Sequence, residues 1–566
     1  MAFFQHRGGH YLILAAAAGL LFFWNLGTAT LWDLDEGRNA TCSGEMNASS
    51  ATDNWITPTF NNALRVDKPV LLYWLQMIGY RVGGINEWTA RLPSAFAGLF
   101  ALLVAYEIAR SLFSKTTALL AGLILASSPM MIGAARFANP DALLNLFNAL
   151  TLLLFWRSYT RPATWCYLAM GAASGMAMLA KGPVGLVLPG AIITLFLLWE
   201  RHLGYFWDRR VGWAFWMFFF VGMPWYILVA VATKLEFARG FFLKHNLERA
   251  MNPMENHSGS VLYYPLVLIL GTLPWSIFAA GALWTAAWSC VRQPKPRWQT
   301  AWDRSADQAG RGGPAAYRFL GLWILVYLTV FSISATKLPN YVLPVVLPWS
   351  ILTARLLDRW RRRMLELPTW WMRMSVASLV LFGVGLGASV ALAGGVGEAS
   401  FLRGRFFPGL APYALFGLIP IVGGLIAAWQ LRLGKRHAFL AIVTVSAVLL
   451  FAPLAAYAGA FFNGFKPARF FAETTEAGRK DLDLQVYSWG ADHLPSLNFY
   501  LRRDVRTLGS GDEVAYHLRS PIPAFIVMPE SNAKQFRELH PSLGKEAGRH
   551  FDLYRGQPLV MLTNRP

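Results

Sequence analysis

Apolar stretches long enough to cross a lipid bilayer recur along this chain of 566 residues. A transmembrane helix needs about 20 mostly apolar residues, and 55% of the residues here are hydrophobic against 14% that are charged. A soluble fold could not bury so many runs of this length. The sequence therefore predicts a polytopic α-helical membrane protein.

We expect about thirteen transmembrane helices before residue 461. They are placed at residues 11–28, 90–110, 117–135, 141–157, 164–181, 183–199, 212–233, 261–289, 317–335, 339–356, 373–395, 411–431 and 438–461.

Basic residues fall in alternate loops between these runs, most densely in "RWRRR" (359–363) and "RLGKR" (432–436). Lys and Arg near the ends of spans are retained on the cytoplasmic side, so these loops predict the inside. The other loops and the C-terminus are then expected outside. The formal net charge of +20 is mostly a topology signal, and we expect no nucleic-acid partner because no basic face on a folded domain is indicated.

The first outer loop, residues 29–89, contains an apolar segment that is not counted as a span. If residues 68–84 crossed the membrane, every later loop would invert. The segment is short, and Tyr73, Gln76 and Tyr80 are dispersed through it. It is therefore expected to be a juxtamembrane helix along the outer interface.

The composition changes after residue 461. Strand-like runs "LDLQVYSW", "PAFIVMP" and "PLVMLTN" alternate there with the helical candidates "PSLNFYLRR" and "ESNAKQFRELH". Residues 462–566 are therefore expected to form a periplasmic α/β domain, following a transmembrane catalytic domain over residues 1–461.

Ionisable residues gather in the outer segments, starting with "TLWDLDEGRNA" (30–40) directly after the first span. The others are Arg65, Asp67 and Lys68; Arg136 and Asp141; Lys244, His245, Glu248 and Arg249; and Lys337 with Tyr341. Each group alone fits a structural explanation: a solvated loop charge, a lysine reaching the headgroups, a first-turn carboxylate or an amphipathic loop helix. Together they predict a cavity of cations and carboxylates at headgroup depth, which suits a lipid phosphate.

Several segments resemble, in order, those of a known enzyme family: "DLDEGRNA", "DKPVLLYW", "ARFANPDALL", "LAKGPVGLVLP", "HNLERA" with "YYPLVLILGTLPW", and "ATKLPNYVLPVVLP". The family is the bacterial aminoarabinose transferases, the ArnT branch of the GT-C glycosyltransferases, which are related to protein O-mannosyltransferases. The resemblance covers roughly residues 10–360.

The resemblance implies a GT-C fold and an inverting glycosyltransferase. The enzyme would move 4-amino-4-deoxy-L-arabinose from undecaprenyl phosphate to a lipid A phosphate, a lipopolysaccharide modification that confers polymyxin resistance. It would act as a monomer, among membrane lipids, in the bacterial inner membrane, with its active site and C-terminal domain facing the periplasm.

The resemblance also assigns residues. It implies that Asp35 and Asp141 are catalytic. Substrate binding falls to Arg38, Lys68, Arg136, His245, Arg249, Lys337 and Tyr341. A divalent metal, zinc or magnesium, would be held by Asp67 and His245, and no other cofactor is implied. Asn39 stands where many relatives have tyrosine, so the contact inferred for that tyrosine is not transferred. Since the acceptor phosphate is already an anion, Asp35 is expected to orient it or to stabilise charge at the anomeric carbon.

Two alternatives remain at this stage. One is a GT-C transferase that moves another sugar from a polyprenyl phosphate to protein or glycan. The other is a lipid transporter, which would place ionisable residues near the midpoints of spans. Apart from Lys181, near the end of a span, the charges cluster on the outer side.

Overall fold

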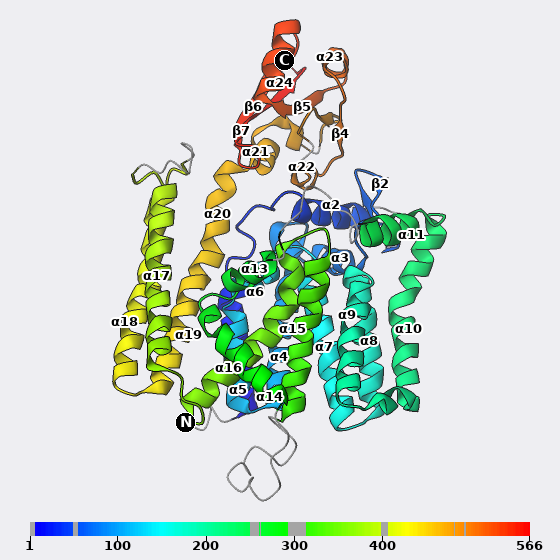
Figure 1. The fold of residues 1–566 in the computed structure, drawn as a ribbon. Helices are drawn as coiled ribbons and strands as arrows, with labels where there is room; N and C mark the ends of the chain where they lie inside the picture. Colours follow the sequence, from blue (N-terminus) through cyan, green and yellow to red (C-terminus); the bar gives the residue numbers. More distant parts are fainter. Residues whose placement is uncertain are drawn as a thin grey trace, which may run out of the picture.

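The computed structural model describes residues 6–48, 55–248, 260, 262–291, 313–397, 406–479, 481–491 and 494–565, without the side chains of residues 244–248. A helical body carries a small α/β domain at one end, and this domain contains the C-terminus (Figure 1).

The helices of the body follow one another in chain order with a short hairpin, β1 (Thr59–Phe60) and β2 (Ala63–Leu64), after α2. They are α1 (Arg7–Ala18), η2 (Gly19–Phe23), α2 (Asp35–Ala48), α3 (Leu71–Gly83), α4 (Glu87–Leu112), α5 (Lys115–Ala126), α6 (Pro129–Arg136), α7 (Asp141–Thr160), α8 (Thr164–Lys181), α9 (Val184–Trp199), η4 (Leu203–Trp207), α10 (Arg209–Ala232), α11 (Glu236–Ala238), η5 (Arg239–Glu248), α13 (Tyr263–Gly271), η6 (Trp275–Phe278), α14 (Ala279–Val291), α15 (Pro314–Ile333), η8 (Pro339–Val342), α16 (Leu343–Arg361), α17 (Thr369–Ala393), η10 (Ala411–Gly417), α18 (Leu418–Arg432), α19 (Arg436–Pro453), η11 (Leu454–Ala458), α20 (Gly459–Phe461) and η12 (Phe462–Phe465).

Among the described residues, seven helices are long and apolar enough to cross a membrane, or up to nine if each of two bent helix pairs is one span. The pairs are α5 with α6, bent by 65°, and α13 with the helix Trp275–Val291, bent by 118°. The expected spans at 11–28 and 183–199 occur as shorter apolar helices, Arg7–Phe23 and Val184–Trp199. The expected count of thirteen is therefore not confirmed, although the polytopic helical architecture is.

The segment expected at the interface forms α3, a helix of 13 residues. This is well short of the roughly 20 residues that a span requires. The helix packs against α2 and α4, and its buried Gln76 side chain donates to the Ala90 carbonyl oxygen (2.8 Å). The outer loop thus has a helical framework of its own.

The C-terminal sheet has five strands in the order β4-β3-β5-β7-β6. Its elements are α21 (Pro467–Thr474), η13 (Glu476–Gly478), β3 (Gln485–Ser488), α22 (Ser496–Leu501), β4 (Val505–Thr507), α23 (Gly511–Arg519), β5 (Ala524–Pro529), α24 (Glu530–Leu539), β6 (Lys545–Asp552) and β7 (Gln557–Thr563). Strand β3 is parallel to β4 and β5, whereas β7 is antiparallel to β5 and β6.

All three expected strands and both expected helices are present in this domain. The central strand β5 is buried on both faces: Phe525 and Val527 face one core, Ile526 and Met528 the other. A strand covered on both faces reads as a continuous apolar run, which explains why the sequence revealed it. The edge strand β6 is mostly polar and half-exposed, and the sequence analysis missed it.

The C-terminal domain rests on the outer loop of the body. Backbone N–H groups of Ser496 and Asp33 make the contact: Ser496 donates to Asp33 Oδ1 (2.7 Å), and Asp33 donates to the Tyr554 hydroxyl (2.8 Å). A Cβ atom at Gly37 would lie 2.5 Å from the Ser496 nitrogen, so only glycine lets α2 approach α22 this closely. The loop that carries the candidate site is therefore covered by the last domain of the chain.

Candidate functional site

Helix α2 divides the ionisable residues of the first outer loop between two faces. Glu36 and Asn39 are fully buried, whereas Asp35 is exposed and Arg38 is half-buried. Residues three apart lie on the same side of a helix, so each pair forms one face. One face holds the helix in the protein, and the other presents a carboxylate and a guanidinium outward.

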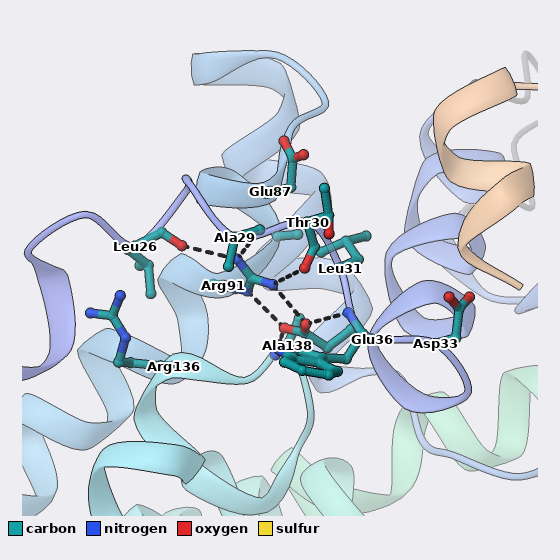
Figure 2. Close-up of polar contacts among 12 residues, drawn as sticks. Leu26, Ala29, Thr30, Leu31, Asp33, Glu36, Glu87, Arg91, Arg136 and Ala138 are labelled. Carbon is teal, nitrogen blue, oxygen red and sulfur yellow. Dashed lines mark hydrogen bonds and ion pairs between the residues drawn. The ribbon is translucent and has the colours of Figure 1, made fainter. Parts of the chain in front are cut away.

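The buried face is anchored by an ion pair between Glu36 and Arg91 (Figure 2). Arg91 donates from Nε to Oε1 and from Nη2 to Oε2, both at 2.8 Å. Glu36 also accepts from the N–H groups of Trp32 (2.9 Å) and Ala138 (2.7 Å). The remaining Arg91 donors reach the carbonyl oxygens of Leu26, Ala29 and Thr30. The pair joins the loop after η2, the start of α2, the start of α4 and the segment before α7.

Burial would raise the pKa of the Glu36 carboxyl, but the Arg91 guanidinium and the N–H groups of Trp32 and Ala138 hold it below its ordinary value. Both oxygens of Glu36 are thus bound by protein donors. Figure 2 shows the Asp33 carboxylate lying apart from this group, because it faces the C-terminal domain. Two of the acids in "DLDE" thus have structural partners and are not available to a ligand.

Asn39 extends the anchoring toward two other segments that carry candidate residues. Its amide donates to the Ala138 carbonyl oxygen (2.9 Å), and its oxygen accepts from Arg65 Nη2 (3.0 Å). Arg65 in turn binds Asp67 through Nε (2.7 Å) and Nη2 (3.1 Å). Helix α2 therefore positions the backbone before Asp141 and the residue before Lys68.

Asp141 is buried at the first position of α7 and forms the centre of a second cluster. Its carboxylate is ion-paired with Lys181, and the Asn340 amide donates to Oδ2 (2.8 Å). The Lys181 ammonium also lies 5.1 Å from the centre of the Tyr341 ring. Two expected site residues, Asp141 and Tyr341, are thus brought together by a lysine from a third segment.

The sequence analysis did not include Lys181 among the site residues, although it quoted the segment "LAKGPVGLVLP" that contains it. Lys181 is the last residue of α8, and Gly182 (φ 78°) ends the helix. A lysine between two apolar runs, followed at once by Gly-Pro, is the signal that could have found it. Arg91, a lone cation at the start of an apolar run, was missed as well.

Lys68 lies between the two clusters, close enough to act electrostatically on both Asp67 and Asp141. In the part of the chain that the structure describes, the side chains of Lys68, Asp35 and Arg38 make no hydrogen bond or ion pair. Charged groups at a membrane interface without protein partners are candidates for binding a ligand. Of the expected site residues whose side chains the structure describes, these three have no hydrogen-bond or ion-pair partner.

Two expected substrate ligands are engaged with the backbone instead. Arg136, at the end of α6, donates to carbonyl oxygens at the end of η2, including that of Trp24 (2.9 Å). The Lys337 ammonium donates to the carbonyl oxygens of Phe331 (3.1 Å), Ser332 and Ser334 (2.8 Å) at the end of α15. The final carbonyls of a helix lack partners within the helix, and cations there also favour the dipole. Both side chains thus act as helix caps in this structure.

Asp67, one of the two expected metal ligands, already has protein partners. Both oxygens of Asp67 accept from Arg65, and no group of three His, Cys, Asp or Glu residues within the described ranges is arranged to hold a metal ion. Burial would raise the pKa of Asp67, but Arg65 outweighs this and, with Lys68, holds the pKa well below its usual range. Of the other expected ligands, Arg249 and the side chain of His245 lie outside the described residues.

The chain is similar to known proteins in both sequence and fold. Residues 67–227 match the family dolichyl-phosphate-mannose-protein mannosyltransferase. The crystal structure of ArnT from Cupriavidus metallidurans bound to undecaprenyl phosphate aligns over 99% of this chain and 99% of that one, with a TM-score of 0.78 and 25% identity. The chain therefore shares the GT-C fold of this ArnT. The apo structure of the same protein aligns with a TM-score of 0.76 and 25% identity, over 98% of this chain and 97% of that one.

Two curated proteins are similar to this chain in sequence. The undecaprenyl phosphate-alpha-4-amino-4-deoxy-L-arabinose arabinosyl transferase 2 of Pseudomonas fluorescens is 30% identical over 61% of this chain and 56% of that protein. The corresponding transferase of Pseudomonas aeruginosa strain UCBPP-PA14 is 30% identical over 60% of this chain and 58% of that protein. The chain thus spans less than two thirds of the length of these curated relatives.

Proposed function

We propose that the chain is a glycosyltransferase that moves 4-amino-4-deoxy-L-arabinose from undecaprenyl phosphate to a phosphate of lipid A. The observation that carries the proposal is the alignment, over nearly the whole of both chains, with an ArnT that binds undecaprenyl phosphate. The three unpartnered charges Asp35, Arg38 and Lys68 support it, because a lipid-linked donor places its phosphate at headgroup depth.

The transfer breaks the bond between the anomeric carbon and the undecaprenyl phosphate oxygen, whose electron pair leaves with the phosphate. The new bond joins the same carbon to an oxygen of the lipid A phosphate. In this proposal Arg38 and Lys68 bind the departing phosphate dianion, and each such contact is a charge-assisted hydrogen bond. Inversion follows if the acceptor oxygen approaches from the face opposite the leaving group.

Asp35 has no proton to remove from an acceptor phosphate that is already ionised. Its exposed carboxylate at the start of α2 is better suited to stabilise positive charge that develops at the anomeric carbon, an electrostatic role. Asp141 is buried and paired with Lys181, so we assign it to positioning Lys181 and Tyr341 around the sugar. No step is assigned to a metal, because Asp67 is bound by Arg65.

The proposed location is the bacterial inner membrane, with α2 and the C-terminal domain in the periplasm. The basic loops 359–363 and 432–436 would then lie in the cytoplasm, as the distribution of Lys and Arg favours. Cysteine accessibility labelling tests this: a cysteine at position 35 should react with a membrane-impermeant reagent in cells whose outer membrane is opened, and one at position 363 should not. The reverse pattern would contradict the proposal.

An assay in detergent with polyprenyl-linked aminoarabinose and purified lipid A, with the products identified by mass spectrometry, tests the activity directly. We expect lipid A to gain the mass of one aminoarabinose residue. Cells with and without this gene give the second comparison, because a transferase that moves another sugar to protein or glycan would leave lipid A unmodified. That outcome would reject the proposed substrates while leaving the fold assignment intact.

A further inference from the structure

A second cluster of cations lies at the end of the helical body away from the C-terminal domain, where α16 ends and α18 turns into α19 (Figure 1). The two groups of basic residues come from the loops at 359–363 and 432–436, which are more than sixty residues apart in the sequence. Together they surround a cavity of about 590 Å³. Its lining, here called the basic cavity, consists of Arg361, Arg362, Arg363, Gly434, Lys435, Arg436, His437 and Ala438.

The walls of the basic cavity are held in place by specific contacts. Arg436 donates from Nη1 to the Trp360 carbonyl oxygen (2.6 Å), and its guanidinium lies 5.1 Å from the centre of the Trp360 ring. The buried Trp360 ring also meets Phe439 of α19 edge-on, with the ring centres 5.6 Å apart. Arg361 Nη1 lies 2.9 Å from His437 Nδ1. These contacts join α16 to α19 across the cavity.

Carboxylates offset only part of the positive charge. Buried Asp358 is paired with Arg361 (2.6 Å) and Arg362 (3.1 Å), and Glu366 with Arg436 (2.6 Å). The side chains of Arg363 and Lys435 have no hydrogen-bond or ion-pair partner within the described ranges. With five Lys and Arg side chains in the lining and two paired carboxylates, the cavity has an unbalanced positive charge and two free donors.

Large apolar side chains are exposed on the segments that flank the lining of the basic cavity in the sequence. Trp429 and Leu433 of the α18 end are 60% and 49% exposed, and Trp370 at the start of α17 is 65% exposed. Tryptophan is enriched at the level of lipid headgroups, so this end of the helices lies at a membrane surface. A soluble anion would use the cations but not the exposed apolar side chains beside them.

We propose that the basic cavity binds the phosphate of an anionic phospholipid, such as phosphatidylglycerol, from the membrane leaflet opposite the proposed reaction centre. Arg363 and Lys435 donate to the phosphate oxygens, and the acyl chains lie along the exposed side chains of α18. Basic pockets between helices on this side of a membrane are suited to anionic headgroups. The bound lipid bridges the ends of α16 and α19, so it links the helices α17 to α19 to the rest of the body.

The test uses the full chain in neutral detergent. Native mass spectrometry measures the binding of dioctanoyl-phosphatidylglycerol, with dioctanoyl-phosphatidylcholine and inorganic phosphate as comparison ligands. The variant is Arg363→Ala/Lys435→Ala. The matched control, Arg161→Ala/Arg201→Ala, removes the same charge from exposed basic residues of two other loops of the same predicted side. All four side chains lack partners in the described structure, and a thermal unfolding scan checks that each variant is folded.

We expect saturable binding of phosphatidylglycerol to the unmodified chain and the control. Binding should be roughly 25-fold weaker in the cavity variant, since each of the two basic residues near an anionic lipid contributes roughly fivefold. Equal losses in both variants would overturn the proposal in favour of a general field effect, and no loss in the cavity variant would place the lipid elsewhere. Binding of phosphate as tight as that of the lipid would make this a soluble-anion site, and equal binding of phosphatidylcholine would exclude headgroup recognition.

Discussion

The guanidinium of Arg91 and the carboxylate of Glu36 face each other through two hydrogen bonds of 2.8 Å, with both side chains buried. The pair holds α2 in an orientation that turns Asp35 and Arg38 outward. It also fixes the Ala138 peptide, three residues before Asp141. The geometry of the candidate site therefore depends on two residues that do not face the proposed substrate.

Replacing Glu36 with glutamine should destabilise the protein by about 3–5 kcal/mol, because Arg91 would remain charged and buried without its counterion. The double variant Glu36→Leu/Arg91→Met removes both charges, but it also leaves the N–H groups of Trp32 and Ala138 and three carbonyl oxygens without these partners, so it too should destabilise the protein by about 3 kcal/mol or more. The control is Glu473→Gln, which breaks an exposed pair with Arg469 and should change stability by less than about 1 kcal/mol. Thermal unfolding in detergent measures all three. Equal effects of Glu36→Gln and Glu473→Gln would show that the buried pair is not structural.

Asp35→Asn should lower the rate of transfer by on the order of 10²- to 10³-fold, the size of effect seen when one electrostatic group is lost from an active site. Because Asp35 is exposed and has no partner among the described residues, the melting temperature should not change. Lipid A modification measured by mass spectrometry gives the rate. Near-normal modification by the variant would remove Asp35 from the reaction.

Lys68→Ala should raise the KM for the polyprenyl-linked donor by about tenfold or more, the loss expected for one hydrogen bond to a charged group. Arg81→Ala is the matched control, since Arg81 is another cation on the outer loop and donates to Asn47. The donor titration is performed at saturating lipid A. An unchanged KM in Lys68→Ala, or an equal rise in both variants, would argue against phosphate binding by Lys68.

Lys337→Met should act on stability more than on the donor. Its three ammonium donors reach carbonyl oxygens at the end of α15, and buried carbonyls left without partners cost about 1–3 kcal/mol each. We expect a lower melting temperature and a smaller change in donor KM than for Lys68→Ala. If instead the KM rises as much as in Lys68→Ala while the melting temperature is unchanged, Lys337 would be a substrate ligand, as the family resemblance implies.

Lys466 gives a prediction about pH. It lies under the outer loop, where its ammonium donates to the Thr30 carbonyl oxygen (3.0 Å) and sits 3.6 Å from the Trp32 ring centre. Burial lowers its pKa to about 8, below the ordinary value of about 10.4. Between these two values the unfolded chain binds the proton more tightly, so this residue makes the folded state more stable as pH rises from about 8 to 10.

Comparison with Lys466→Met isolates this contribution, because other lysines titrate in the same range. The difference in unfolding free energy between the unmodified chain and Lys466→Met should grow in favour of the unmodified chain from pH 8 to 10. Denaturant titrations in detergent at several pH values measure it. A difference that stays constant over this range would show that the pKa of Lys466 is not shifted in the folded protein.

The sequence alone determined the class of fold and the location of the charged segments. Long apolar runs are costly to leave in water, and extended strands without a partner are costly in lipid, so the pattern of hydrophobicity nearly dictates a helical membrane protein. The buried strand β5 and the short helix α3 could be predicted for the same reason: length and hydrophobic pattern are local properties. The segments that resemble the aminoarabinose transferases, which carry Asp35, Lys68 and Asp141, could also be recognised from the sequence.

Only the tertiary structure decided what each charge does. The first outer loop contains four charged residues within a stretch of eleven. Asp33 contacts the C-terminal domain and Glu36 forms an ion pair with Arg91. Asp35 and Arg38 have no partner among the described residues. The partner of Asp141 is Lys181, forty residues away in the sequence. The free energy of a charged side chain depends on burial and on the groups within a few ångströms of it, and in this fold those groups come from segments that no local pattern connects.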